Sequence, residues 1–113
     1  MIVKNRIKKY SEFQKVIEAA DVKKTSFFVS YRLKNELGYS RFGISVPKKT
    51  GNAVVRNRIK RQVRAAIGLS TNFEESIDIV IIVRKNYKID DFNQIKSEIQ
   101  SLLKQEKIRE KKK

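Results

Sequence analysis

The sequence predicts an α+β protein, a two-layer α/β sandwich in which a small central sheet packs against helices. Three segments carry apolar residues at helical spacing, and three others alternate apolar and polar residues or run continuously apolar, as strands do. In chain order the expected elements are helix, strand, strand, helix, strand and helix. A length of 113 residues suits one core, so we expect a single domain over residues 1–113.

The first helix is expected to begin at Ser11. Residues 11–14 read Ser-Glu-Phe-Gln, which has the form of a capping box with Ser11 as N-cap and Gln14 reaching back. We expect the helix to run to about Ala20. Its apolar stripe, by default a core face, consists of Phe13, Val16, Ile17 and Ala20.

Two alternating segments follow, over Thr25–Lys34 and Tyr39–Val46. Both are rich in β-branched and aromatic residues, and Asn35–Gly38 between them has the composition of a turn. The sequence therefore predicts an antiparallel hairpin. Pro47 closes the second strand, because proline cannot continue a hydrogen-bonded ladder.

The central helix is predicted over Asn52–Gly68, with Asn52 as N-cap and Gly68 at the position of a terminating glycine. Its apolar stripe consists of Val55, Ile59, Val63, Ala66 and Ile67. The opposite side is positive and carries no carboxylate of its own; it is formed by Asn57, Arg58, Lys60, Arg61 and Arg64. Arg56 lies in the first turn, beside backbone N–H groups of residues 53–55 that could hold a phosphate.

The segment Ile77–Val83 is almost continuously apolar, as in a strand covered on both faces, and we expect it at the centre of the sheet. A helix separates it from Tyr39–Val46, so these two strands are expected to be parallel, with a right-handed crossover as the general default. The last helix is expected to start at Asp90 or Asp91. Its apolar stripe consists of Phe92, Ile95, Ile99, Leu102 and Leu103, before a basic tail over residues 107–113 that we expect to fray.

The charge pattern points to a polyanionic partner. The formal net charge is +15, and residues 37–73 contain no Asp or Glu while eight Lys and Arg accumulate there. A surface built only for solubility would intersperse both signs. We therefore expect nucleic acid as the partner and, since the basic helix has no aromatic residue to anchor it in lipid, no membrane.

Protein-based catalysis has few residues to use. The chain contains no Cys and no His, which excludes thiol and histidine catalysis and the usual zinc sites. The remaining route is a carboxylate cluster holding Mg²⁺, with Glu74, Glu75, Asp78, Asp90 and Asp91 as candidates. We predict no catalytic residue and no metal ligand in this chain. The absence of cysteine fits a cytoplasmic location, and no signal segment is recognisable.

Aromatic residues lie among basic ones on the two alternating segments. Phe28, Tyr31 and Tyr39 occur beside Arg32, Lys34 and Arg41. Unpaired bases stack on such rings, at about 1 to 3 kcal/mol per base. The alternative is that these rings belong to an ordinary core.

Read as one string, Lys48-Lys49, Gly51-Asn52-Ala53-Val54, Arg56-Asn57-Arg58, Lys60-Arg61 and Arg64 closely resemble the signature of the bacterial ribonuclease P protein component. The segments RIKKYSEFQKV, FFVSY, FGISVPKK and IDIVIIVRK also resemble that family, so the likeness covers nearly the whole chain. It implies an αβββαβα sandwich with an unusual left-handed βαβ crossover around the basic helix. It also implies the small subunit of a ribonucleoprotein that removes the 5′ leader of precursor tRNA, with catalysis by the RNA subunit and its Mg²⁺.

The resemblance also assigns residues to two surfaces. The basic helix would face the catalytic RNA through Arg56, Asn57, Arg58, Lys60, Arg61 and Arg64. A cleft between the first helix and the sheet would take the single-stranded leader, lined by Phe13, Ile17, Val29 and Tyr31, with Lys48 and Lys49 at its basic rim. Members of the family often carry an aromatic residue at the position of Ile17.

Two alternatives remain open at this point. A structural RNA binder of ribosomal or chaperone type would share the charge without needing the cleft, and a metal nuclease would act through its own carboxylates. The charge also predicts that sulfate or phosphate stabilises the folded state by binding to it.

Overall fold

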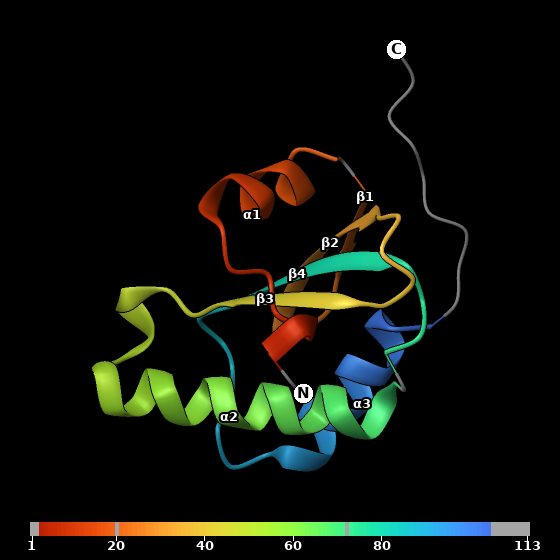
Figure 1. Cartoon of the computed structure of the whole chain (residues 1–113). Helices are drawn as coiled ribbons and strands as arrows, with labels where there is room; N and C mark the ends of the chain where they lie inside the picture. Colours follow the sequence, from red (N-terminus) through yellow and green to blue (C-terminus); the bar gives the residue numbers. More distant parts are fainter. Residues whose placement is uncertain (1–2, 20, 72, 105–113) are drawn as a thin grey trace.

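Four strands and three α-helices form the chain in a computed structural model, which describes residues 3–19, 21–71 and 73–104 (Figure 1). Two short 3-10 turns, η1 (Val3–Asn5) and η2 (Lys48–Thr50), accompany them. The elements are, in order, α1 (Tyr10–Ile17), β1 (Asp21–Lys24), β2 (Phe28–Lys34), β3 (Arg41–Ser45), α2 (Ala53–Ser70), β4 (Ile77–Val83) and α3 (Phe92–Leu102). This is the αβββαβα order that the resemblance implies.

The four strands form one sheet in the order β1-β2-β4-β3. β4 pairs antiparallel with β2 and parallel with β3, so it is a central strand, as its apolar run predicts. The predicted hairpin of the second and third strands was wrong, because β4 lies between them. Since both faces of β4 are apolar and must be covered, β4 takes an interior position, and the chain from β2 to β3 passes over its start. There the backbone N–H of Asn35 donates to the Ser76 carbonyl at 3.1 Å.

The hairpin that does form joins β1 to β2. β1 reads Asp-Val-Lys-Lys, which lacks an apolar pattern, and reasoning from periodicity did not predict it. The predicted strand over Thr25–Lys34 begins only at Phe28, because residues 25–27 form the turn of this hairpin. The turn is closed by backbone hydrogen bonding from Thr25 N–H to the Phe28 carbonyl at 2.8 Å.

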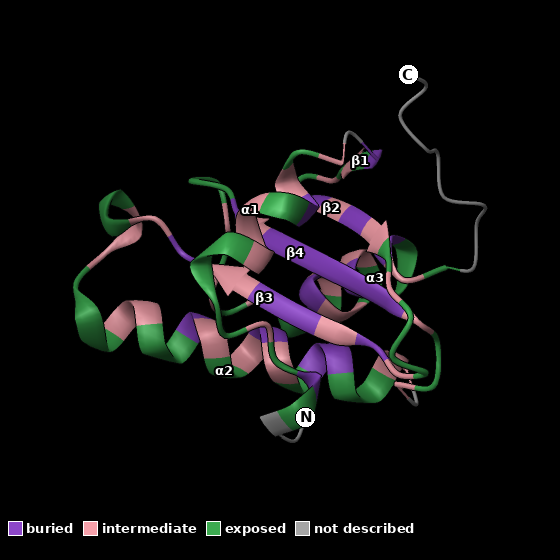
Figure 2. Ribbon diagram, turned by 45° about the horizontal axis from the view of Figure 1, so that its top comes forward, coloured by how far each residue is buried: buried purple, intermediate pink, exposed green. Residues whose placement is uncertain are grey.

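Helices cover the two faces of the sheet unequally. α2 and α3 pack on one face, and the shorter α1 lies on the other (Figure 1). The main core is on the α2 and α3 side, where strand residues such as Phe28, Ile79 and Ile81 meet Val63 and Ile99. Figure 2 shows that buried positions concentrate on the central strands and on the inner sides of these helices.

The connection β3-α2-β4 is a left-handed crossover. Viewed from the α2 side with both strands pointing upward, β4 lies to the left of β3 (Figure 1 and Figure 2). The hand therefore agrees with the resemblance and differs from the right-handed default for βαβ units.

The ends of α1 differ from the prediction. The helix begins at Tyr10, its N-cap is Lys9, and no side chain caps it. Gln14 donates its amide to the Tyr10 hydroxyl instead of reaching back to the backbone. The helix ends at Ile17, and Ala20 lies outside the described residues, as does the basic tail over 107–113.

The other predicted helix starts are confirmed. Asn52 Oδ1 accepts from the Val55 N–H at 3.0 Å at the start of α2, and Asp91 accepts from the Gln94 N–H at the start of α3. Gly68 does not end α2, which continues to Ser70. Buried Ala66 and Ile67 hold this last turn against the core, so the helix does not need a left-handed glycine there.

Candidate nucleic-acid interface

The first candidate surface is the outward side of α2. Ile59, Val63, Ala66 and Ile67 face the core and are buried. Among the residues predicted for this surface, Asn57, Arg58 and Arg61 are exposed, whereas Arg56, Lys60 and Arg64 are half-buried. We refer to these six residues as the basic face of α2, and the structure brings them together along one helix as predicted.

One carboxylate from another segment approaches this face. Arg58 lies 3.7 Å from Asp90, a carboxylate outside the helix that the charge pattern of α2 alone did not predict. Both side chains are largely exposed, and such a pair contributes at most about 1 kcal/mol. Within the described part of the chain, Lys60, Arg61 and Arg64 form no ion pair. Their charge remains available to an external anion.

The start of α2 retains part of the predicted phosphate site. The Val55 N–H is occupied by the Asn52 cap, and Arg56 Nε donates to the Gly51 carbonyl at 3.2 Å. Ala53 and Val54 are exposed at the first helical positions, where α-helices have unsatisfied N–H groups. Lys48 and Lys49 are also exposed and lie just ahead, in η2.

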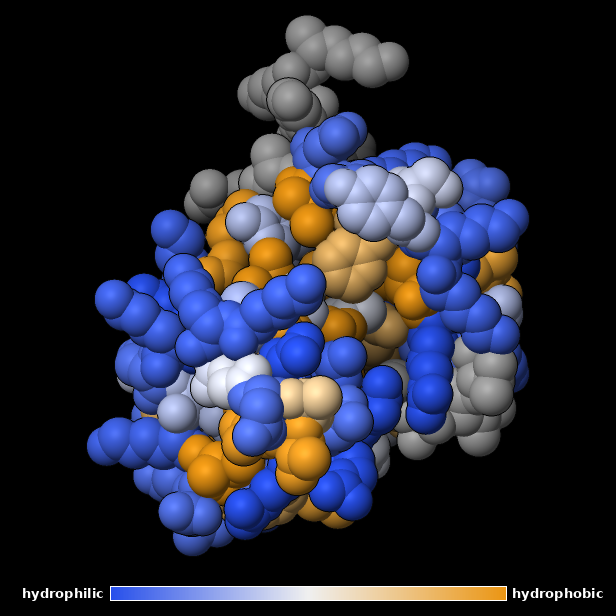
Figure 3. Space-filling view, turned by 90° about the vertical axis from the view of Figure 1, so that its left-hand side faces the viewer, coloured by the Kyte–Doolittle hydropathy of each residue, from blue (hydrophilic) through white to orange (hydrophobic). Residues whose placement is uncertain are grey.

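The second candidate surface is on the other side of the sheet, where α1 is too short to cover the strands. Val29 and Ile82 are register partners there, and Tyr31 pairs with Val80 on the same face. Val29, Tyr31, Ile82 and Ser45 are each half-buried, and we call this set the open sheet face. Figure 3 views the end of the molecule where β3 and β4 finish, and shows apolar side chains gathered within a border of hydrophilic ones.

The helix α1 forms one wall of the open sheet face. Val16 is buried beneath it, and the ring of Phe13 lies against Gly43 of β3, beside Val80. Ile17 is half-buried one turn further along the helix. The structure thus brings Phe13, Ile17, Val29 and Tyr31 to the same side of the sheet, while Lys48 and Lys49 follow the end of β3.

A partly buried ion-pair network fixes α1 to the sheet. Arg41 donates to both carboxylate oxygens of Asp78, with distances of 3.0 and 2.6 Å, and its third nitrogen donates to Glu12 of α1 at 2.9 Å. The hydrogen bond to Asp78 raises the pKa of Arg41 above its ordinary value. Because α1 is held through Glu12, this network sets its position relative to the strands.

Several residues expected beside nucleic acid are instead structural. Phe28 is fully buried in the core, so its ring cannot stack on a base. Arg32 is buried and paired with Asp21 at 3.3 Å, and Arg41 is held by Asp78. Tyr39 is half-buried, with the ammonium group of Lys4 lying 4.9 Å from its ring centroid. Of the three aromatic candidates, Tyr31 is the one on the open sheet face.

Sequence reasoning overlooked Tyr10. Its side chain is 76% exposed at the first turn of α1. Residues 10, 13, 14 and 17 follow the i, i+3, i+4, i+7 spacing, so Tyr10 shares a side of the helix with Phe13 and Ile17. That spacing was visible in the sequence, but the misplaced N-cap put Tyr10 outside the predicted helix.

The carboxylates proposed for a metal nuclease are not assembled. Within the described residues, no group of three or more acidic side chains is placed to hold a metal ion. Asp78 is engaged by Arg41, and Asp91 is a helix cap. No helix in the described segments is both long and apolar enough to span a membrane.

Together, the acid-poor helix face and the partly covered aromatic sheet face define a small α+β protein built to bind nucleic acid. Comparison with known families gives a specific assignment. The family model for ribonuclease P matches residues 1–107, and the chain belongs to the ribonuclease P protein component family.

Named relatives and solved structures agree. The chain is 46% identical over 102 residues to the ribonuclease P protein component of Mesoplasma florum, covering 88% of this chain and 93% of the relative. It is 41% identical to that of Clostridioides difficile, covering 90% and 91%. The RNase P protein of Staphylococcus aureus aligns with a TM-score of 0.76 at 35% identity, covering 88% and 92%. The Thermotoga maritima protein aligns with a TM-score of 0.74 at 29% identity, covering 87% and 94%.

Proposed function

We propose that this chain acts as the protein subunit of a ribonuclease P holoenzyme that removes the 5′ leader from precursor tRNA in the cytoplasm. The basic face of α2 contacts the catalytic RNA, and the open sheet face with α1 holds the single-stranded leader. The RNA subunit and its Mg²⁺ carry out the cleavage. The protein raises affinity for precursor tRNA relative to mature tRNA.

One observation carries this proposal: the two candidate surfaces meet at the same end of the molecule. β3 ends at Ser45, and η2 leads directly into the first turn of α2 (Figure 1). Lys48 and Lys49 therefore lie between the open sheet face and the basic face of α2. An RNA strand crossing the sheet can pass these lysines and reach a second RNA bound along the helix.

The two surfaces have different chemistry, which suits different roles. The basic face of α2 offers arginine forks to phosphates, and this binding is strong, salt-dependent and largely independent of sequence. The open sheet face offers Tyr31 and Phe13, whose rings suit unpaired bases. Mature tRNA has no leader, so the open sheet face favours the precursor.

Two further properties follow from the charge. Neutralising RNA phosphates near the cleavage site lowers the Mg²⁺ concentration that the holoenzyme requires. Free sulfate or phosphate stabilises the folded chain, because an anion bound to the folded state shifts the unfolding equilibrium. The second property is checked by melting curves in sulfate and chloride at matched ionic strength.

The deciding experiment measures cleavage of a leader-bearing precursor tRNA by a bacterial ribonuclease P RNA at low Mg²⁺. We expect leader removal when RNA and protein are both present and little when either is absent. The Tyr31→Ala variant is expected to bind the RNA subunit normally and to lose the preference for precursor over mature tRNA. The Tyr39→Ala variant serves as a control, since Tyr39 is off the open sheet face.

Other outcomes point to the alternatives. Tight RNA binding without stimulation of a cognate RNA subunit would favour a structural RNA-binding role. Leader removal by the protein alone would favour a protein-based nuclease. An unchanged preference in Tyr31→Ala would contradict the role of the open sheet face.

A further inference from the structure

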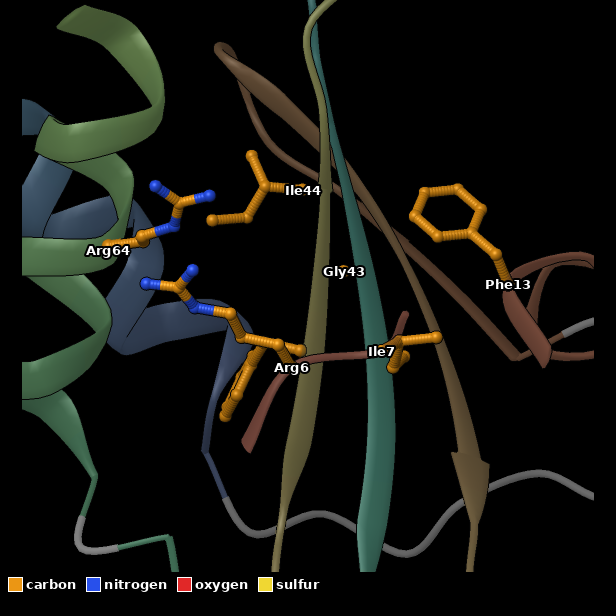
Figure 4. A pocket seen from close by; sticks show the side chains of 7 residues that line it. Arg6, Ile7, Phe13, Gly43, Ile44 and Arg64 are labelled. Carbon is orange, nitrogen blue, oxygen red and sulfur yellow. The ribbon is translucent and has the colours of Figure 1, made fainter. Parts of the chain in front are cut away.

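Two arginines from distant parts of the chain point into one small pocket beside β3. Arg6 belongs to the segment that precedes α1, and Arg64 belongs to α2. Figure 4 shows both guanidinium groups on the α2 side of β3, directed into the same space near Ile44. The pocket has a volume of about 120 Å³, several times the space that one water molecule needs.

The backbone holds Arg6 firmly in this position. Arg6 forms a parallel bridge with Phe42, and the N–H of Ile7 donates to the Phe42 carbonyl at 3.0 Å. One residue earlier, the buried amide of Asn5 donates to the Ser40 carbonyl at 2.7 Å. The segment therefore lies along the outer edge of β3. This backbone pairing places the Arg6 side chain on the α2 side of the strand.

Within the described residues, the two guanidinium groups have no acidic partner. Arg64 Nε is buried and has no hydrogen-bond partner. Burial and the nearby charge of Arg6 both lower the pKa of Arg64. None of the described residues that line the pocket is acidic, and neither arginine forms an ion pair within the described part of the chain. Two like charges and an unsatisfied donor share a space that an anion would fit.

We propose that Arg6 and Arg64 clamp one tetrahedral oxyanion, a phosphate or a sulfate group, in this pocket. Arginine presents planar pairs of N–H donors that match such oxygens, and two arginines can neutralise a dianion. The bound group joins the segment before α1, the edge strand β3 and the helix α2. The site is distinct from the helix start at Asn52, and it assigns a binding role to Arg6.

The test titrates the full chain with sodium phosphate at constant ionic strength, using sodium chloride as balance, and follows the melting temperature. The wild type is expected to show a saturable increase. Arg6→Ala and Arg64→Ala are each expected to weaken the apparent phosphate affinity at least tenfold. Lys8→Ala and Lys88→Ala remove the same charge from exposed positions outside the pocket, and both variants are expected to retain the apparent phosphate affinity of the wild type. Equal loss in all four variants would show general charge screening and overturn the clamp.

Two further measurements keep the test decisive if a variant folds poorly. Arg6→Lys and Arg64→Lys retain the charge and lose the paired donors, so they are expected to fold and still bind phosphate more weakly than the wild type. In the wild type, the NMR signal of the Arg64 Nε–H group is expected to move with phosphate and not with chloride. An unchanged signal at saturating phosphate would overturn the proposal.

Binding to a bacterial ribonuclease P RNA separates the two sources of the oxyanion. A backbone phosphate of that RNA could occupy the clamp, and this case rests on the proposed function. Arg6→Ala would then weaken RNA binding, and free phosphate would compete with the RNA. If a free anion occupies it, Arg6→Ala loses phosphate stabilisation and keeps its RNA affinity. Either result supports the clamp. The melting titration tests the clamp independently of whether the chain promotes leader cleavage.

Discussion

The ring of Phe13 lies so close to Gly43 that a methyl group at residue 43 would come within 2.6 Å of it. The strand β3 therefore needs glycine at this position for α1 to sit where it does. We expect Gly43→Ala to displace the Phe13 ring and destabilise the fold by about 1 to 3 kcal/mol, as overpacking does. Urea unfolding measures the loss, and the precursor preference is expected to fall with it because α1 is a wall of the open sheet face.

A matched control is available at Gly68, where an added methyl group meets no atom within 4 Å. Gly68 lies inside α2, so Gly68→Ala is expected to stabilise the chain by roughly 0.5 to 1 kcal/mol through helix propensity. Equal stability of Gly43→Ala and the wild type would mean that Phe13 moves aside without cost.

The ion-pair network at Arg41 predicts that the pair with Asp78 contributes more to stability than the pair with Glu12. Asp78 is buried and bound by Arg41 through both oxygens. Arg41→Ala leaves its charge without an ion-pair partner, with the Asn35 amide still donating to it at 2.8 Å, and is expected to cost roughly 3 kcal/mol. Glu12 is more exposed, and Glu12→Gln is expected to cost at most about 1 kcal/mol.

Urea unfolding of Glu12→Gln, of Arg41→Ala, of Asp78→Ala and of the Arg41→Ala, Asp78→Ala double variant tests this network. The double variant is expected to recover part of the loss, because it removes the orphaned carboxylate. Additive losses in the double variant would show that the two side chains do not depend on each other.

The raised pKa of the Tyr87 phenol leads us to expect a loss of stability at alkaline pH. Burial raises the pKa of its phenol above the ordinary value near 10, and its hydroxyl donates to Gln62 Oε1 at 2.9 Å. The unfolded chain ionises first as pH rises. The stability contributed by the protonated phenol is therefore fully present below about pH 10 and is lost as pH climbs towards the folded-state pKa.

The measurement compares the free energy of unfolding at neutral pH with that above about pH 10, for the wild type and for Tyr87→Phe. The variant is expected to be less stable at neutral pH, because it lacks the bond to Gln62, and to lose less on the change to alkaline pH. Identical losses would place the alkaline sensitivity in other groups.

The basic face of α2 predicts a change in salt dependence. Replacing Arg58 and Arg61 with Ala is expected to weaken binding to a ribonuclease P RNA. The slope of log affinity against log salt is expected to become shallower by roughly 0.7 to 0.9 for each lost phosphate contact. Lys24→Ala combined with Lys85→Ala removes two charges from exposed positions outside α2 and provides the charge-matched control. An unchanged slope in the double variant would place the RNA elsewhere.

Local features were largely predictable from the sequence. The caps at Asn52 and Asp91, most of the core stripes of α2 and α3 and the central position of β4 followed from residue type and spacing. Phe92 was wrongly placed in the core stripe of α3, because its side chain is exposed. The order and partners of the strands were harder. The alternation of β2 and β3 fits a direct hairpin as well as it fits a sheet with β4 between them. The second arrangement forms because β4 is covered on both faces, which depends on the packing of the whole fold.

The candidate site was predictable where the resemblance supplied it, and less so from the residues alone. Phe28 and Arg32 looked available beside Tyr31, yet both lie on the core side of β2. A charged residue at an alternating position usually faces solvent, but Arg32 is buried because Asp21 of the unpredicted strand β1 neutralises it. The pairing of Arg6 with Arg64 arises from tertiary packing, and no local pattern in the sequence signals it.

The place of β4 in the sheet also has a consequence for how the chain is made. β2 and β3 leave the ribosome well before residues 77–83, so their facing edges have no partner while the rest is being translated. Pairing between segments far apart in sequence is slow, and exposed strand edges invite pairing with other chains. The nascent chain therefore presents its acid-free, strongly cationic segment before a sheet exists to support it. Polyanions in the cell can meet this protein before it has finished folding.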